Sequence, residues 1–324
     1  MIFNDVLKIR NGRNQKNVEN PNGKYPIYGS GGIMGYANDY ICEADTVIIG
    51  RKGNINNPIF VEEPFWNVDT AFGLSAKKEL LLPKYLYYFC QKFDFERLNK
   101  AVTIPSLTKA DLLKIEIELP SIEIQKKVVD ELSKIEQIIQ IRKQELEKLD
   151  ELIKARFVEM FGDIVLNPFG WSKESFGEIC DVRDGTHDSP KYYETGYPLV
   201  TSKNVTGGKI DLKDCSFICK ADFNKINERS KVDIGDIIMP MIGTVGKPVI
   251  VDIEPNFAIK NVSLIKFKTN SRVLNIYICA LLQSDYFNDA VLSKARGGTQ
   301  KFISLGDIRK LEVLVPPVAL QKHF

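Results

Sequence analysis

The chain has 324 residues, of which 44% are hydrophobic and 27% are charged, a balance that is ordinary for a folded globular protein. Its 44 Lys and Arg side chains nearly cancel its 42 Asp and Glu side chains, so the net charge indicates no particular partner. This composition excludes a mostly disordered chain and a collagen, and no run approaches the roughly 18 apolar residues of a membrane-spanning helix. At roughly 100–200 residues per domain, the length indicates two domains.

The first 120 residues are predicted to mix strands with helices. Strands are expected at 47–49, 58–61 and 115–119, the last from the alternation of apolar and acidic residues. A helix is expected at 84–99, directly behind Pro83. Because strands and helices do not alternate regularly, we predict an α+β domain at residues 1–120 rather than a doubly wound sheet.

Residues 121–161 contain no Gly and no Pro, which predicts one long helix that Ser121 caps and Gly162 ends. At 1.5 Å per residue this helix would be roughly 60 Å long, more than one domain of this size can cover. Apolar side chains recur at steps of four and three, with Arg142 and Arg156 at the two remaining positions of the pattern. This heptad pattern predicts a spacer helix with a seam for a partner helix: Val128, Leu132, Ile135, Ile139, Leu146, Leu149, Ile153 and Met160. A long amphipathic helix packed on its own domain is the alternative.

The second half is predicted to form another mixed domain, at residues 162–317. Strands are expected at 237–241, 249–252, 262–267 and 311–315, and helices at 275–283 and 286–294. Residues 318–324 match 122–128, the first two turns of the spacer helix. They therefore predict the start of a second, truncated spacer helix.

The two halves repeat each other. Residues 111–128 align with 307–324 at a constant offset of 196 without gaps, and six of the eighteen pairs are identical. The segment at 3–12 resembles 176–185, and Tyr-Pro-Ile at 25–27 resembles Tyr-Pro-Leu at 197–199. Most of the extra length of the second half falls between Asn204 and Gly235, which marks a stretch that is free to specialise.

No catalytic motif is apparent. The sequence has no G-x-x-x-x-G-K-[ST] phosphate loop, no G-x-G-x-x-G fingerprint and no methyltransferase tetrapeptide of the Asn/Asp-Pro-Pro-aromatic type. The six cysteines form no C-x-x-C pair, and no secretory leader is visible at Met1. We therefore expect a non-enzymatic, cytoplasmic protein with reduced thiols and no bound metal.

Taken in order, these segments resemble the specificity subunit of type I DNA restriction–modification systems. The features that carry the resemblance are the two variable halves, the end of the long helix at 156–163 (RFVEMFGD), and the segments at 167–171 (NPFGW), 25–32 (YPIYGSGG) and 298–305 (GTQKFISL). The resemblance covers essentially the whole chain. Family members carry a second long helix after the second half, of which only the first turns occur here.

The resemblance implies that each half is a target recognition domain that reads one part of a split double-stranded DNA site. The long helix would set the gap between the two parts. Modification subunits that bind S-adenosylmethionine would dock on it and methylate adenine, and a motor and nuclease subunit using ATP and Mg would join for cleavage. The chain would hold no cofactor of its own. Its unpaired helix could also join a second copy of the chain.

Base recognition needs side chains with fork or amide geometry on exposed loops. In the first half, Arg51 suits guanine, Asn54 suits adenine and Lys52 suits a phosphate, while Tyr28 and Ser30 lie in a flexible Gly-rich turn. In the second half, matching positions and a basic Gly-broken loop give further candidate DNA-binding residues: Lys203, Asn204, Thr244, Lys247, Arg296, Thr299, Gln300 and Lys301. Solvated or purely structural turns are the alternative at each place.

Charge suggests that the chain binds DNA weakly on its own. Residues 1–120 carry 15 basic and 14 acidic side chains, and residues 162–324 carry 21 and 19. Because neither domain is strongly basic, firm binding is expected only with modification subunits. A scaffold that does not bind nucleic acid, with duplicated ligand domains on a coiled-coil spacer, is the competing hypothesis.

Overall fold

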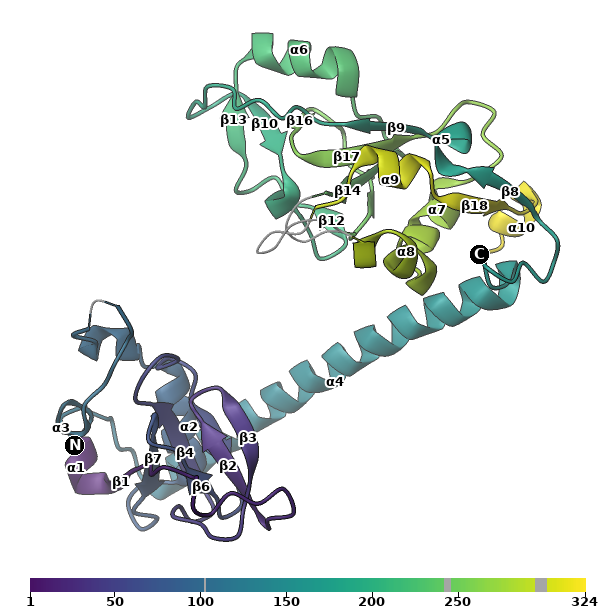
Figure 1. Cartoon of the computed structure of the whole chain (residues 1–324). Helices are drawn as coiled ribbons and strands as arrows, with labels where there is room; N and C mark the ends of the chain where they lie inside the picture. The colour runs from purple at the N-terminus through teal and green to yellow at the C-terminus, as the bar shows by residue number, and fades with distance from the viewer. Residues whose placement is uncertain (102, 242–245, 295–301) are drawn as a thin grey trace. The chain divides into compact units, whose positions relative to one another are not determined.

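The computed structural model describes residues 1–101, 103–241, 246–294 and 302–324, which form two compact units, Met1–Gln144 and Glu145–Phe324 (Figure 1). Each unit combines antiparallel sheets with short helices, and one long helix runs from the first unit into the second. The predicted α+β class, with two mixed domains joined by a long helix, is confirmed. The predicted boundaries at 120, 161 and 317 stay predictions.

Unit 1 is built on two sheets. The larger is antiparallel, with the strand order β1 (Leu7–Asn11), β7 (Ala71–Ala76), β4 (Thr46–Gly50) and β5 (Ile59–Val61). The smaller has the order β3 (Gly32–Ala37), β2 (Tyr25–Gly29) and β6 (Trp66–Asn67), with β2 and β6 parallel. The helical segments are α1 (Phe3–Val6), α2 (Pro83–Lys92), η1 (Phe95–Leu98) and α3 (Lys109–Leu112).

Unit 2 repeats this arrangement. Its larger sheet has the order β9 (Asp181–Asp184), β17 (Val262–Lys266), β14 (Ile237–Pro240) and β15 (Val249–Ile250). A three-stranded sheet has the order β13 (Ser216–Ile218), β10 (Tyr197–Val200) and β16 (Ala258–Ile259), and β8 (Ser172–Ser175) pairs with β18 (Glu312–Val315). Unit 2 also contains these helical segments: α5 (Phe176–Ile179), α7 (Asn275–Leu282), α8 (Asp285–Ala290), η3 (Leu292–Lys294), α9 (Leu305–Arg309) and α10 (Val318–Gln321).

The repeat extends to single hydrogen bonds. The amide of Phe3 donates to the Ile115 carbonyl at 2.9 Å, and the amide of Phe176 donates to the Leu311 carbonyl at 2.8 Å. Both pairs fall at the offsets found in the sequence, 173 and 196. The predicted duplication is therefore confirmed as a duplication of backbone pairing as well as of residues.

Unit 2 differs from unit 1 by additional elements. The connection from β2 to β3 is a tight turn, whereas between β10 and β13 the chain adds η2 (Ser202–Asn204) and a hairpin of β11 (Val205–Thr206) with β12 (Lys209–Ile210). The helix α6 (Lys220–Ser230) follows β13. These additions lie in the stretch that sequence comparison marks as expanded.

Helix α4 (Ile122–Phe161) has 40 residues, as the absence of Gly and Pro predicts. Ser121 accepts a hydrogen bond from the Ile124 amide at 3.4 Å, and Gly162, with φ of +81°, follows the last turn. The indole of Trp171 donates to the Phe161 carbonyl at 3.1 Å, which satisfies a group that the helix end leaves open.

A buried glutamine fixes the first turn of α4 to unit 1. Gln125 is fully buried, and its Nε2 donates to the carbonyls of Leu80 and Pro120, both at 2.9 Å. Its Oε1 accepts from the amide of Leu82, the residue before α2, at 2.9 Å. One side chain thus joins the start of the long helix to the start of a domain helix.

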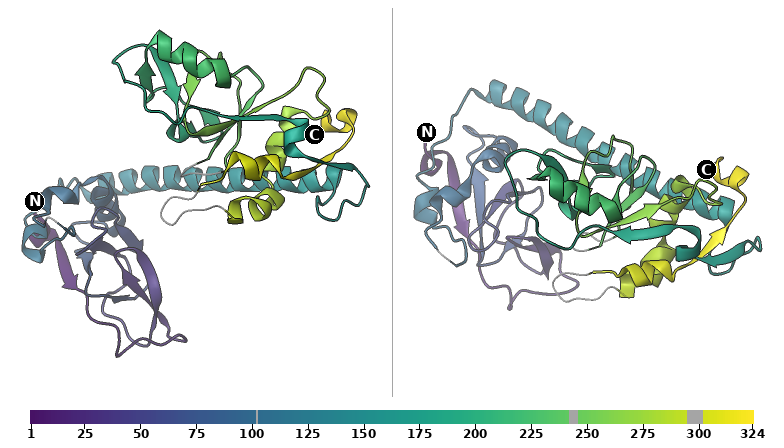
Figure 2. Two further views of the ribbon diagram at one scale, coloured as in Figure 1. Left: turned by 45° about the horizontal axis from the view of Figure 1, so that its top comes forward. Right: turned by 90° about the horizontal axis from the view of Figure 1, so that it is seen from above.

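Gln321 in α10 makes the same three bonds in unit 2. Its Nε2 donates to the carbonyls of Arg272 and Pro316 at 2.9 and 2.8 Å, and its Oε1 accepts from Leu274, the residue before α7, at 2.7 Å. The sequence match between 122–128 and 318–324 therefore reflects a shared way of leaving the domain. Phe324, shortly after α10, packs edge-on against Phe157 in the last turns of α4. Both views of Figure 2 show the C-terminus beside the end of this helix.

Two expected elements of unit 1 differ in the structure. The predicted strand at 115–119 is reduced to a bridge between Glu116 and Ile2, because only the short segment at residues 1–3, which turns into α1, runs beside it. The predicted helix at 84–99 breaks after Lys92, where Asp94 accepts a bond from the side chain of Asn56 at 2.9 Å. Tertiary bonds to Asn56 therefore outweigh the local helical pattern.

Within the described ranges, no helix is both long and apolar enough to cross a membrane. The same part of the chain holds no cluster of three metal-ligating side chains. All six cysteines are described and unpaired, and burial raises the pKa of Cys42 and of Cys180 to about 12.

Replacing Gln125 by Ala should lower the free energy of unfolding by about 2–4 kcal/mol, because three buried backbone groups would lose their partner. Gln137→Ala, at an exposed site of the same helix, should change it by less than about 0.5 kcal/mol. Scanning calorimetry of both variants measures the difference. Equal, small effects would show that the buried amide does not hold the helix start.

Candidate nucleic-acid interface

The topology of unit 1 gathers the predicted reading loops at one edge of the larger sheet. Strands β1 and β4 are both antiparallel to β7, so they run in the same direction and end at the same edge. The loop at 51–54 follows β4 there, the segment at 12–13 follows β1, and β7 begins beside them. We call the loops at this edge the reading edge of unit 1.

The loop at 51–54 has a fixed backbone and exposed side chains. The amides of Arg51 and Lys52 donate to the Thr70 carbonyl at 2.7 and 3.2 Å, and the Leu107 amide donates to the Arg51 carbonyl at 2.9 Å. The side chains of Arg51, Lys52 and Asn54 are exposed. The Arg51 guanidinium lies 5.9 Å from the centre of the Phe72 ring. Side chains carried on a braced loop lose less conformational freedom on binding, which favours recognition.

The Gly-rich turn lies beside this loop. A Cβ added at Gly50 would come within 3.1 Å of the Ser30 Cβ and 2.0 Å of the Asn54 carbonyl oxygen. Only Gly permits this approach, so the structure brings Ser30 close to the loop that carries Arg51 and Asn54, a proximity that sequence alone did not predict. Tyr28 is half-buried and packs edge-on against Phe65 with ring centres 5.4 Å apart.

The hydroxyl of Tyr28 stays protonated over the whole neutral range. Its pKa is raised, first by burial and then by the nearby charges of Glu63 and Tyr36. A protonated phenol both donates and accepts hydrogen bonds. Tyr28 can therefore contact either a phosphate or a base edge.

In unit 2 the candidate DNA-binding residues differ in their exposure to solvent. Lys203 and Lys247 are exposed. Asn204 is buried: its Oδ1 accepts from the amide and the hydroxyl of Thr201, each at 3.0 Å, and its Nδ2 donates to the Asp211 carbonyl at 3.2 Å. These bonds give Asn204 a role in shaping the loop. Five candidates lie outside the described residues: Thr244, Arg296, Thr299, Gln300 and Lys301.

A polar cluster that is not among the residues predicted from sequence lies at the matching edge of unit 2, where β9 ends. His187 Nε2 lies 2.8 Å from the Asp184 carboxylate, and His187 Nδ1 lies 2.9 Å from Asn261 Oδ1. Arg229 of α6 forms an ion pair with the same carboxylate. The cluster borders a cavity of about 350 Å³. The available signal was the pair Asp184-Gly185, which repeats Asn11-Gly12 at the end of β1.

In unit 2, β9 and β14 are both antiparallel to β17 and end at the same edge, whose loops we call the reading edge of unit 2. The two reading edges share one backbone bond that identifies them as equivalent. The Ile303 amide donates to the Met241 carbonyl at 3.1 Å, as Leu107 does to Arg51. Gly12 and Gly185 lie so close to the neighbouring chain that a Cβ would come within 1.7 Å of the Val68 oxygen and 2.4 Å of the Ile259 oxygen. The framework is conserved between the units, and the side chains it carries differ.

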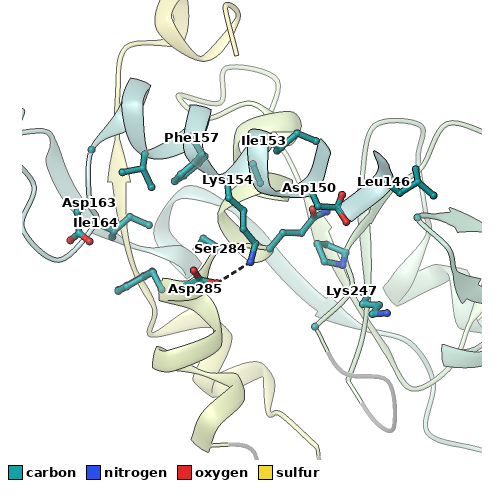
Figure 3. Close-up of a pocket in the computed structure, with 18 of the residues that line it drawn as sticks. Leu146, Asp150, Ile153, Lys154, Phe157, Asp163, Ile164, Lys247, Ser284 and Asp285 are labelled. Carbon is teal, nitrogen blue, oxygen red and sulfur yellow. Dashed lines mark hydrogen bonds and ion pairs between the residues drawn. The ribbon is translucent and has the colours of Figure 1, made fainter. Parts of the chain in front are cut away.

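A second surface lies along α4 within unit 2. A cavity of about 720 Å³ is lined by the seam residues Leu146 and Ile153, and Lys154 crosses to Asp285 of α8 with an Nζ to Oδ1 distance of 2.9 Å (Figure 3). Lys247 also lines this cavity. The predicted reader Lys247 therefore lies at this cavity beside α4.

The predicted seam of α4 is exposed over its middle. Met160 is buried, and Val128 and Leu132 are half-buried. The five residues between them have exposed fractions of 47–64%: Ile135, Ile139, Leu146, Leu149 and Ile153. So long a row of exposed aliphatic side chains is typical of an interface.

Comparison with known proteins identifies the family. The sequence pattern of the type I restriction modification DNA specificity domain matches twice, at residues 3–151 and 168–323. The chain is 24% identical over 300 residues to the type I restriction enzyme MjaVIII specificity subunit of Methanocaldococcus jannaschii, covering 86% of this chain and 67% of that one. It is 25% identical over 309 residues to a putative type I restriction enzyme specificity subunit of Haemophilus influenzae, S.HindORF215P, covering 92% and 78%.

The fold has a solved counterpart. The crystal structure of a type I restriction–modification system S subunit from M. genitalium superposes with a TM-score of 0.62 at 17% identity, covering 99% of this chain and 86% of that one. The chain belongs to the type I restriction modification DNA specificity family. It is a DNA sequence-recognition subunit and not a catalytic one, and the scaffold alternative is not favoured.

Replacing Gly53 by Ala should destabilise the reading edge of unit 1. Gly53 has φ of +79°, and a Cβ there would meet open space, so backbone strain of about 1 kcal/mol is the only expected cost. Gly31→Ala also points into open space but without a left-handed backbone, and should cost almost nothing. Thermal unfolding compares the two variants. A larger loss for Gly31→Ala would mean that the loop geometry is wrongly assigned.

Proposed function

We propose that each unit reads one half of a split double-stranded DNA target through its reading edge. The observation that carries the proposal is the duplication of this edge, with the same strands, the same backbone bond and the same close-packed glycine in both units. Two different half-sites can be recognised by two domains that share one backbone architecture but carry different side chains. The reading edges of units 1 and 2 differ in this way.

In unit 1 the proposed roles follow from side-chain chemistry. Arg51 presents two parallel donors to guanine O6 and N7, and Asn54 pairs with adenine N6 and N7. Lys52 binds a phosphate, and Tyr28 and Ser30 add hydroxyl contacts. In unit 2, Lys203 and Lys247 supply positive charge. The remaining residues proposed to bind DNA are those predicted from sequence alone: Thr244, Arg296, Thr299, Gln300 and Lys301.

We further propose that the chain acts with partner subunits in the cytoplasm. Modification subunits would supply S-adenosylmethionine and methylate adenine, and a motor and nuclease subunit would use ATP and Mg. The near-balance of charge in residues 1–120 and 162–324 supports this division, since neither segment has the net positive charge that would hold DNA firmly by electrostatics alone. Partner subunits would provide the remaining affinity.

Two substitutions test the reading edge of unit 1. In the complex with modification subunits, Arg51→Met should relax discrimination at one base pair by about 1–3 kcal/mol. Lys52→Met should weaken binding to all sequences alike and reduce the slope of log K against log salt by about one. The measurement is equilibrium binding to the selected duplex and its single-base variants at two salt concentrations.

Lys78→Met is the matched control. Lys78 is paired with Asp45 at 2.6 Å, beside the opposite ends of β4 and β7, and its loss should leave affinity and specificity unchanged. If Arg51→Met keeps full discrimination at every position, the edge is not the reader.

The exposed seam of α4 is proposed to pair with the same helix of a second chain. Burying an Ile or Leu side chain yields about 1.5–3 kcal/mol, so five such residues on each helix suffice for association. The heptad spacing of these side chains is typical of a helix pair, and pairing would remove them from water. The 720 Å³ cavity lined by Leu146 and Ile153 lies on the same surface.

Sedimentation of the purified chain tests the pairing. The unmodified chain should form a dimer at micromolar concentration, and Ile139→Glu should shift it to a monomer. Gln140→Glu changes charge at the next, exposed position and should leave the dimer intact. A monomer at high concentration for the unmodified chain would rule out the pairing.

A further inference from the structure

The tip of the β2–β3 hairpin in unit 1 exposes two adjacent large apolar side chains. Ile33 is 56% exposed and Met34 is 61% exposed, although both belong to a strand. Neighbouring residues of a regular strand point to opposite faces, so at most one of them is normally in contact with solvent when one face is packed. Neither side chain belongs to a hydrophobic core cluster among the described residues of unit 1.

The hairpin is irregular where these residues lie. Ile27 is opposite Gly35 and Tyr28 is opposite Ile33, so Met34 is the extra residue of a β-bulge. Bulges redirect side chains and are frequent next to functional sites. The Met34 sulfur fills the place above Gly29 where a Cβ would lie, 2.7 Å from that position. The absence of a side chain at Gly29 therefore accommodates the bulge.

The tip is thin and adjoins the reading edge. Gly31 and Gly32 have open space around their Cβ positions. Ile33 lies opposite Tyr28, on the same face of the hairpin, and Ser30 lies against Gly50 at the base of the loop that carries Arg51. The apolar tip of the hairpin therefore lies next to the exposed loop that carries Arg51, Lys52 and Asn54.

We propose that this hairpin tip enters the major groove and that Ile33 and Met34 contact the C5 methyl group of a thymine there. The proposal rests on the proposed function and names a base that unit 1 reads. The major groove is about 12 Å wide and admits a two-stranded ribbon, and the thymine methyl is the apolar group it displays. Lys52, in the loop beside the tip, matches the negative charge of the phosphates, and Arg51 of the same loop is placed to reach a neighbouring guanine.

A protein partner explains the same residues less well. A basic loop beside the hairpin and glycines at its tip both favour close approach to a duplex, whereas binding to a protein surface depends on neither. Docking to a modification subunit is therefore treated as an outcome that would overturn the proposal.

The test uses the complex with modification subunits and the duplex site that it selects from a random library. Each thymine of that site is replaced in turn by uracil, which removes only the C5 methyl group. At one or two positions within one half-site, binding should weaken about fourfold, the ratio expected for losing one buried methyl group. In the double variant Ile33→Asn, Met34→Gln, the affinities for thymine and uracil should become equal.

Controls separate this result from other effects. Leu80→Gln removes another exposed apolar side chain, at the opposite end of β7, and should keep the fourfold preference for thymine. Thermal unfolding should be unchanged in all variants, because the replaced side chains are exposed.

Four outcomes would overturn the proposal: a selected site without thymine in either half, no uracil penalty, a penalty that persists in the double variant, or a loss of modification-subunit binding with the penalty intact. If the complex selects no split site at all, the proposed function itself fails.

Discussion

A buried glutamine amide at the start of a helix is the contact on which this molecule depends. Gln125 and Gln321 each satisfy three backbone groups that link the exit from a domain to the helix inside it. A buried amide with fixed partners allows no sliding, because each unsatisfied group would cost about 1–3 kcal/mol. The first turn of α4 and the first turn of α10 therefore each have a fixed direction relative to the domain that they leave.

The two units share one backbone framework that carries two different sets of exposed side chains, as the proposed reading of two different half-sites requires. The strands, the close-packed glycines and the backbone bond from Leu107 to Arg51 recur in unit 2, where the last becomes the bond from Ile303 to Met241. The side chains at the reading edge differ: unit 1 has the loop with Arg51 and Asn54, and unit 2 has a cluster around Asp184 and His187. Specificity can diverge there without disturbing the core.

Sequence alone predicted the features that depend on local pattern or on repetition. The duplication, the long helix and the identity of Gln125 with Gln321 were visible, since periodicity and matched spacing need no tertiary information. The break after Lys92 was not, because it depends on Asn56, distant in sequence. The bulge at Met34 and the bonds that bury Asn204 likewise arise from pairing partners that a linear pattern does not specify.

The most direct test of the central claim, that two equivalent edges read two separated half-sites, is a map of methylated bases. Genomic DNA would be sequenced for methylation from a host that carries modification subunits with and without this chain. Adenine methylation is expected at one split motif with a gap of fixed length, and only when the chain is present. Methylation at an uninterrupted motif, or a pattern that the chain does not alter, would contradict it.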